Sequence, residues 1–176
     1  GTRSTFTINS NTSGVAGFGG TIDGNVTIVF NSTTGNANGW SFAAPNTYSG
    51  GTILNSGTIS IGADNALGTG GLTFNGGILN TTANMSSTRA LTLAGGGGTL
   101  NVNTSRTLTF AGSLTGSGSL TKSGSGTLLM TTSNAGTYTG LTSINAGLLA
   151  VSATDALGSS TVTVNSGGIL EIRNTT

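Results

Sequence analysis

Four carboxylates are the residues of this 176-residue chain that could do acid or base chemistry: Asp23, Asp64, Asp155 and Glu171. Glycoside hydrolysis on a β-rich scaffold would need two such groups held close together. The four positions are scattered along the chain, and His and Cys are both missing from it. Without imidazole or thiolate there is no nucleophilic relay and no usual zinc site. We therefore expect a non-enzymatic protein with no catalytic residue, no metal site and no cofactor.

The remaining candidates have structural interpretations. Asp64 and Asp155 each lie just before an Ala-Leu-Gly segment, where a short acidic side chain can cap a turn. Trp40, Tyr48 and Tyr138 could stack on sugars, but core or corner packing is the favoured interpretation. We expect Lys122 to cover a corner of the fold with its aliphatic stem.

The composition excludes several classes of partner. Gly, Thr, Ser and Asn make up 106 of the 176 residues, charged residues are 5%, and the net charge is +1. A chain with so few cations has no basic field to hold a phosphate backbone, so nucleic-acid binding is not expected. No 18-residue apolar run occurs, so we expect no membrane insertion of this segment.

Short apolar clusters predict strands. Hydrophobic residues are 34% of the chain and alternate with Thr or Asn in seven clusters, which argues against a flexible linker. Helical stripes are not found, so the chain is predicted to be all-β. The clusters are Phe6–Ile8, Val26–Phe30, Leu72–Phe74, Leu91–Leu93, Leu100–Val102, Leu108–Phe110 and Val162–Val164.

An internal duplication selects the architecture. Residues 47–75 align with residues 137–165 at a constant offset of 90, with Tyr48 opposite Tyr138. Within it, leucines that join apolar clusters recur every 17 to 20 residues, at Leu72, Leu91, Leu108, Leu128 and Leu148. A unit of about 20 residues is too short to bury a face alone and gains a core by stacking on its neighbours.

These features predict a parallel β-solenoid of roughly seven to nine rungs in one domain, 1–176. Residues 1–45 would form degenerate N-terminal rungs or a cap, 46–135 a first repeat block and 136–176 a second, partial block. A β-sandwich is the structural alternative. We further expect Tyr48 and Tyr138 to occupy equivalent corners, and Leu108, Leu128 and Leu148 to form one buried ladder.

One motif resembles a known family. Residues Gly118–Leu128 followed by Tyr138–Leu149 closely resemble the passenger-associated transport repeat, a β-strand repeat of bacterial autotransporters, and Tyr48–Ile59 is a second, partial copy. The copy at Tyr48 lacks the upstream Lys-x-Gly-x-Gly half, and Leu141 stands where the family often has a second Gly.

The resemblance implies a right-handed parallel β-helix from the surface-exposed or secreted passenger of a type V secretion protein. Such a segment would be anchored to the outer membrane through a part outside this chain. It would serve as a stalk that supports adhesion or cell–cell aggregation and aids export and folding of the passenger. The expected partners are the chain itself, end to end or side by side, and surface glycans or proteins.

Two alternatives stay open. One is a subunit of an extracellular filament that assembles end to end through unpaired strand edges, with contacts through the termini rather than the Thr-rich sides. The other is binding of ice or crystalline polysaccharide by Thr-x-Thr ladders, for which the candidate segments are Thr5–Thr7, Thr107–Thr109 and Thr161–Thr163.

Overall fold

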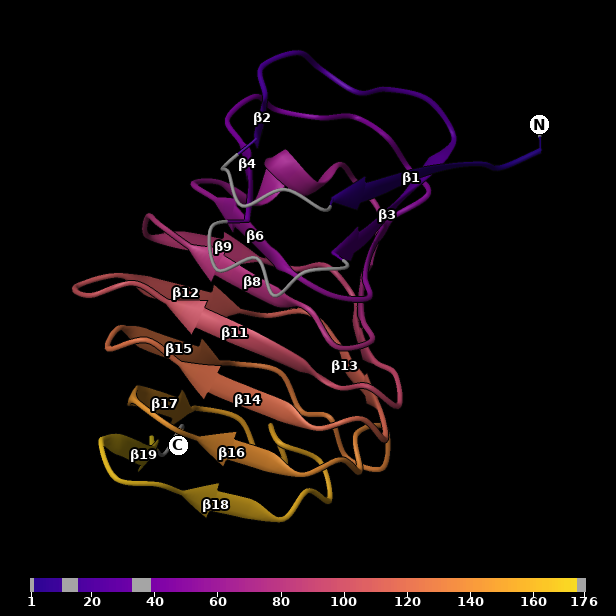
Figure 1. Cartoon of the computed structure of the whole chain (residues 1–176). Coiled ribbons are helices and arrows are strands. Elements are labelled where there is room, and N and C mark those ends of the chain that lie inside the picture. Colours follow the sequence, from indigo (N-terminus) through magenta and orange to yellow (C-terminus); the bar gives the residue numbers. More distant parts are fainter. Residues whose placement is uncertain (1, 11–15, 33–38, 174–176) are drawn as a thin grey trace.

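The chain folds into a β-solenoid of about seven turns (Figure 1). The computed structural model describes residues 2–10, 16–32 and 39–173. Three parallel sheets, here named A, B and C, form the sides of the solenoid, and the strands succeed one another from the N-terminal to the C-terminal end. All strand pairs in these ranges are parallel, which excludes the antiparallel sandwich.

Sheet A contains six strands in the order β1-β3-β5-β7-β10-β13. Their bounds are β1 Ser4–Ser10, β3 Val26–Ser32, β5 Thr52–Leu54, β7 Leu72–Phe74, β10 Leu91–Leu93 and β13 Leu114–Gly116.

Sheet B is the longest, with eight strands in the order β18-β16-β14-β11-β8-β6-β4-β2. Their bounds are β2 Ala16–Phe18, β4 Trp40–Phe42, β6 Thr58–Ile61, β8 Ile78–Thr81, β11 Gly98–Val102, β14 Leu120–Ser123, β16 Thr142–Ile144 and β18 Val162–Val164.

Sheet C has five strands in the order β19-β17-β15-β12-β9. Their bounds are β9 Met85–Ser87, β12 Thr107–Phe110, β15 Thr127–Met130, β17 Gly147–Val151 and β19 Gly168–Ile172. A short 3-10 helix, η1 (Asp64–Leu67), contacts β9 at the N-terminal end of this sheet. All seven apolar clusters of the sequence thus lie in strands.

The alternation of apolar and polar residues explains the core. In β10 the side chains of Leu91 and Leu93 are buried while Thr92 between them is exposed, because successive side chains of a strand point to opposite faces. Partners of Leu91 on both neighbouring strands, Leu72 and Leu114, are buried too, so the inward residues stack as a ladder.

Rung length varies within narrow limits. Successive partners lie between 19 residues apart, as for Leu72 and Leu91, and 24 residues apart, as for Ile28 and Thr52. At one corner between sheets A and B the rungs are joined by an asparagine ladder, in which Asn55 donates to Asn31 at 2.8 Å and Asn75 donates to Asn55 at 3.4 Å. The ladder fixes the register of consecutive rungs.

The two repeat copies lie on different faces of the solenoid, so the prediction of equivalent corners is wrong. Four rungs counted along sheet A lead from Leu54 through Phe74, Leu93 and Gly116 to Tyr138. Tyr138 is therefore stacked in line with Leu54, six residues beyond Tyr48. The offset of 90 residues is therefore longer than four complete rungs, and the excess places the second copy on the next face of the solenoid.

This rotation changes which side of the solenoid carries the Ala-Leu-Gly turn in place of a strand. In the first copy the Ala-Leu-Gly turn lies beside β9, on the side of sheet C, and β5 and β6 belong to sheets A and B. In the second copy the corresponding turn stacks on the segment around Tyr138, on the side of sheet A, since the Ser159 N–H donates to the Tyr138 carbonyl at 2.9 Å. Strands β16 and β17 belong to sheets B and C.

The structure corrects two further expectations. Leu108 and Leu128 are paired and buried, but the next partner in sheet C is Leu149, while Leu148 is half-buried and pairs with Thr127. The single ladder through Leu148 is wrong, because the step from β15 to β17 is 21 residues rather than 20. Thr7 lies on sheet A, Thr109 on sheet C and Thr163 on sheet B, so the Thr-x-Thr segments do not form one array.

Candidate functional site

The carboxylates do not gather into one site. Asp64 pairs with Arg89, with Nε to Oδ1 at 2.8 Å, and Glu171 pairs with Arg173 at 3.1 Å. The hydrogen bond from Arg173 lowers the pKa of Glu171. Among the described residues no group of three or more His, Cys, Asp or Glu side chains could hold a metal ion. The scatter of acids that the sequence indicated is therefore retained in three dimensions.

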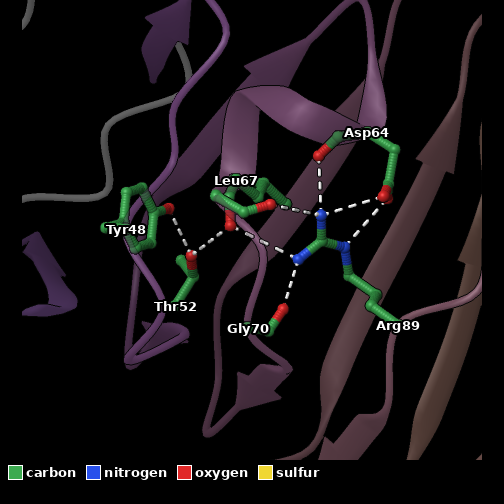
Figure 2. A network of polar contacts seen from close by, with 7 residues as sticks. Tyr48, Thr52, Asp64, Leu67, Gly70 and Arg89 are labelled. Carbon is green, nitrogen blue, oxygen red and sulfur yellow. Dashed lines mark hydrogen bonds and ion pairs between the residues drawn. The ribbon is translucent and has the colours of Figure 1, made fainter. Parts of the chain in front are cut away.

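The densest polar network surrounds Arg89 and is drawn in Figure 2. Its guanidinium binds both carboxylate oxygens of Asp64, at 2.8 and 2.9 Å, and its side chain is only 6% exposed. It also donates to the carbonyls of Asp64 at 2.7 Å and Gly70 at 2.6 Å, with longer contacts to Leu67 and Gly68 at 3.3 Å. Arg89 thus satisfies the carbonyls left free where η1 ends.

Asp64 does not cap this turn as the sequence suggested. The residue before the helix, Ala63, makes no side-chain cap, and the Asp64 carboxylate is used for the ion pair with Arg89. Arg89 was not among the candidates that the sequence indicated. It lies 25 residues after Asp64, slightly more than the length of one rung, and that spacing could have suggested the pairing.

Tyr48 is buried and belongs to the same network (Figure 2). We call the buried hydrogen bonds of the Asn and Tyr side chains, here Asn46 and Tyr48, the lock of the repeat. The Tyr48 hydroxyl is 2.6 Å from the Thr52 hydroxyl, which in turn donates to the Leu67 carbonyl at 3.5 Å. Burial raises the pKa of Tyr48, an effect that the hydrogen bond to Thr52 and the charge of Arg89 oppose. A fully buried tyrosine presents no ring face to a sugar, which supports the packing interpretation.

Asn46 completes the lock. Its amide oxygen accepts from the Ile22 N–H at 2.7 Å, and its amide nitrogen donates to the Ala66 carbonyl at 2.6 Å, so one buried side chain ties three consecutive rungs together. Such contacts satisfy backbone groups on the side where the turn takes the place of a strand. The sequence analysis missed Asn46, although an Asn shortly before Tyr in both copies was a usable signal.

The second copy rebuilds this lock. Asn134 accepts from the Leu114 N–H at 2.7 Å and donates to the Ala156 carbonyl at 2.7 Å, as Asn46 does in the first copy. The hydroxyl of Tyr138 donates to the Leu141 carbonyl at 2.9 Å and accepts from the Leu120 N–H at 3.1 Å. Burial raises the pKa of Tyr138.

Lys122 lies inside the core rather than over a corner. Its neighbours in register are Leu100 and Ile144, and the whole residue is fully buried. The ammonium donates to the carbonyls of Ser123 and Gly124 at 2.8 Å and of Ala146 at 3.0 Å. Burial lowers its pKa to about 8. The aliphatic stem therefore fills a leucine position while the ammonium caps two corners from within.

Trp40 belongs to an aromatic cluster near the N-terminal end. Its ring stacks on Phe18 with centroids 5.4 Å apart, and Phe18 stacks on Phe42 at 5.3 Å. Trp40 is half-buried in this cluster, and it packs against the core. These residues hold the first rungs together, in agreement with the packing interpretation.

Four of the polar side chains described above act on the backbone of neighbouring rungs. Asn46, Asn134, Arg89 and Lys122 each bind carbonyls from turns that lie outside the strand ladders. No described helix is long and apolar enough to cross a membrane. These contacts can stabilise a stack of rungs, and the four residues do not form a paired acid and base.

Comparison with known proteins agrees with this picture. The family model of the passenger-associated-transport-repeat matches residues 34–61 and 120–151, which contain the strands on either side of the two locks and Lys122 itself. The chain therefore contains two segments that match the passenger-associated transport repeat. Each matched segment overlaps one copy of the duplication, including Thr52 in the first and Tyr138 in the second.

A curated relative points to the same class. The chain is 47% identical over 73 residues to the adhesin BmaC autotransporter of Brucella suis biovar 1 (strain 1330). The match covers 40% of this chain and 2% of that protein, so the chain spans a very small part of the relative's length. No solved structure matches. The two repeat matches and the match to an autotransporter adhesin show that the chain is similar to autotransporter passenger proteins.

Proposed function

We propose that this chain is a non-enzymatic stalk segment of a surface-exposed or secreted passenger, which supports adhesion or cell–cell aggregation by holding other parts of the passenger away from the cell. The observation that carries the proposal is the unbroken stacking of parallel rungs along sheet B, from β2 to β18. Each rung contacts mainly its two neighbours, so length can be added or removed in units without a change of fold.

Local stacking also suits export. A chain that leaves through a narrow pore unfolded can fold one rung at a time outside, because each new rung finds its template in the rung before it. The buried locks at Asn46 and Asn134 fix the register of each added rung. Folding of this kind would favour outward movement of the passenger.

The test removes one rung in register. Deletion of residues 91–113, from Leu91 to the residue before its partner Leu114, should leave a cooperatively folded rod that is shorter by about 4.8 Å. Deletion of residues 91–101, which breaks the register, should unfold the chain. In a displayed passenger the first deletion should keep surface exposure of a distal epitope and the second should abolish it. Equal loss from both deletions would contradict the stalk.

A second candidate function is a subunit of an extracellular filament that assembles end to end. In such a filament an edge strand of one copy would pair with an edge strand of the next, which would bury apolar surface and satisfy backbone groups. Electron microscopy of the isolated chain decides: ordered filaments with a regular repeat support this candidate, and monomeric rods at high concentration contradict it.

A further inference from the structure

A shallow hollow lies on the corner between sheets B and C, in the middle of the solenoid. Its volume is about 340 Å³, and it is lined by Thr82, Asn103, Thr104, Arg106, Gly124 and Ser125. The lining comes from three consecutive rungs, since Thr81 is the partner of Val102 and Asn101 is the partner of Ser123. Three rungs span about 10 Å, so the hollow has room for a sugar residue.

The charge in this hollow is positive and unopposed. Arg106 is exposed, and its guanidinium forms no hydrogen bond or ion pair within the part of the chain that the structure describes. The nearby rungs supply no carboxylate to the lining. A guanidinium presents its N–H groups in a fixed fork that matches a carboxylate in two parallel hydrogen bonds.

A second cation lies beneath the same corner. The ammonium of Lys122 binds the carbonyls of Ser123 and Gly124 from the core side, at 2.8 Å each. Those two carbonyl oxygens therefore point inward, away from the hollow. If they pointed into the hollow, they would repel an anion. Because the ammonium is buried, water screens its field less than that of a surface lysine.

The rest of the lining consists of uncharged hydrogen-bonding groups. The hydroxyls of Thr104 and Ser125 lie 2.6 Å apart, and the Asn103 side chain is half-buried beside them. Hydroxyls and amides of this kind bind sugar hydroxyls, which both donate and accept. A polyanion that needs many cations would find no further ones along this face, because the whole chain carries five Lys and Arg residues.

We propose that this hollow binds a single acidic sugar residue, a hexuronate of a surface polysaccharide, with its carboxylate on Arg106 and its hydroxyls on Thr104, Ser125 and Asn103. The site lies on the side of the rod, so it is independent of the stalk and filament proposals. With one ion pair in an open hollow, the affinity for one sugar unit is weak, with a dissociation constant on the order of 1 mM. Many copies on one cell surface would raise the avidity.

The test is a titration of the isotope-labelled 176-residue chain with sodium glucuronate, at constant ionic strength, followed through the backbone amide resonances of residues 103–106 and 124–126. Saturable shifts confined to these residues are expected, and neutral glucose should produce none. Arg106→Gln should weaken binding at least tenfold, whereas Arg3→Gln, which removes another exposed arginine, should bind as the unchanged chain does. Because Arg106 is exposed, the variant should keep the thermal midpoint of the unchanged chain.

Two further arms separate a sugar site from a general anion site. Thr104→Val should weaken glucuronate binding and leave sulfate binding unchanged, because only the sugar uses the hydroxyl. Unchanged affinity of Arg106→Gln for glucuronate would overturn the site itself. Sulfate that binds the unchanged chain as tightly as glucuronate, or shifts produced equally by glucose, would overturn the assignment to an acidic sugar.

Discussion

In the first copy of the repeat the strands β5 and β6 lie in sheets A and B, whereas in the second copy the corresponding strands β16 and β17 lie in sheets B and C. Both copies retain the Asn and Tyr locks. The second copy is thus turned by one face without losing these contacts. The lock is therefore local to the repeat and does not depend on the face of the solenoid on which the repeat lies. In the first copy the turn at Ala66–Gly68 is also covered by the guanidinium of Arg89, which comes from the following rung.

The largest effect tests which residues of β17, in the second copy, face inward. Leu149 stacks on Leu128 and is fully buried, while Leu148 is half-buried. Leu149→Asn should lower the free energy of unfolding by about 2 to 4 kcal/mol, because it buries an amide without partners in an apolar ladder. Leu148→Asn should cost much less. Denaturant unfolding monitored by circular dichroism measures both, and the reverse order of the two effects would show that the inward and outward positions of β17 are exchanged.

The cover over the first turn gives the next largest effect. Arg89→Met should lower the free energy of unfolding by roughly 2 to 3 kcal/mol, because it leaves several carbonyls and the Asp64 carboxylate, which is 31% exposed, without their donor. Arg173→Met, which breaks an exposed pair, is the matched control and should leave stability unchanged. If both variants behave alike in thermal unfolding, the contacts of Arg89 do not stabilise the first turn.

The core lysine, whose ammonium caps a corner of the second copy, gives a pH-dependent effect. The folded pKa of Lys122 is about 8, and an unfolded lysine titrates near ~10.4, so between these values the unfolded chain binds more protons. Stability should therefore rise by roughly 1 to 3 kcal/mol from pH 8 to pH 10. Lys122→Met should abolish this rise in urea unfolding series. Parallel pH profiles of the two proteins would contradict the placement of the ammonium.

The two buried tyrosines impose the opposite pH dependence. Burial raises the pKa of Tyr48 and of Tyr138, so above pH ~10 the unfolded chain loses phenolic protons that the folded chain keeps. Stability should then fall as the pH rises further. The unchanged chain is expected to be most stable near pH ~10, and Lys122→Met should show only the fall.

The smallest effect separates the two locks. Tyr138 makes hydroxyl contacts to Leu141, Leu120 and Thr142, whereas the Tyr48 hydroxyl contacts Thr52. Tyr138→Phe should cost about 1 to 2 kcal/mol and Tyr48→Phe about 1 kcal/mol, because net hydrogen-bond energies are of this size. Thermal unfolding of both variants measures the difference. A larger loss for Tyr48→Phe would mean that the network through Thr52 and Leu67 is the tighter lock.

The sequence by itself determined where the strands lie and most of their inward positions. Alternation of apolar residues with Thr and Asn marks inward and outward positions in each strand, and all seven predicted clusters became strands. The rung of about 20 residues and the repeat motif were also readable, because stacking requires the same unit to recur at a fixed length. Trp40, Tyr48 and Tyr138 were correctly interpreted as packing residues.

Only the tertiary structure decided the face on which each strand lies. One rung contains up to three strands with the same local chemistry, so a leucine series with regular spacing can pass from sheet A at Leu91 to sheet C at Leu108. Because the turns vary in length, a rung contains between 19 and 24 residues, and the sum of these lengths sets the rotation between the two copies. The contacts of Lys122 and the pairing of Arg89 with Asp64 depend on these rung lengths too, because the rung lengths decide which turn of the neighbouring rung lies beside each side chain.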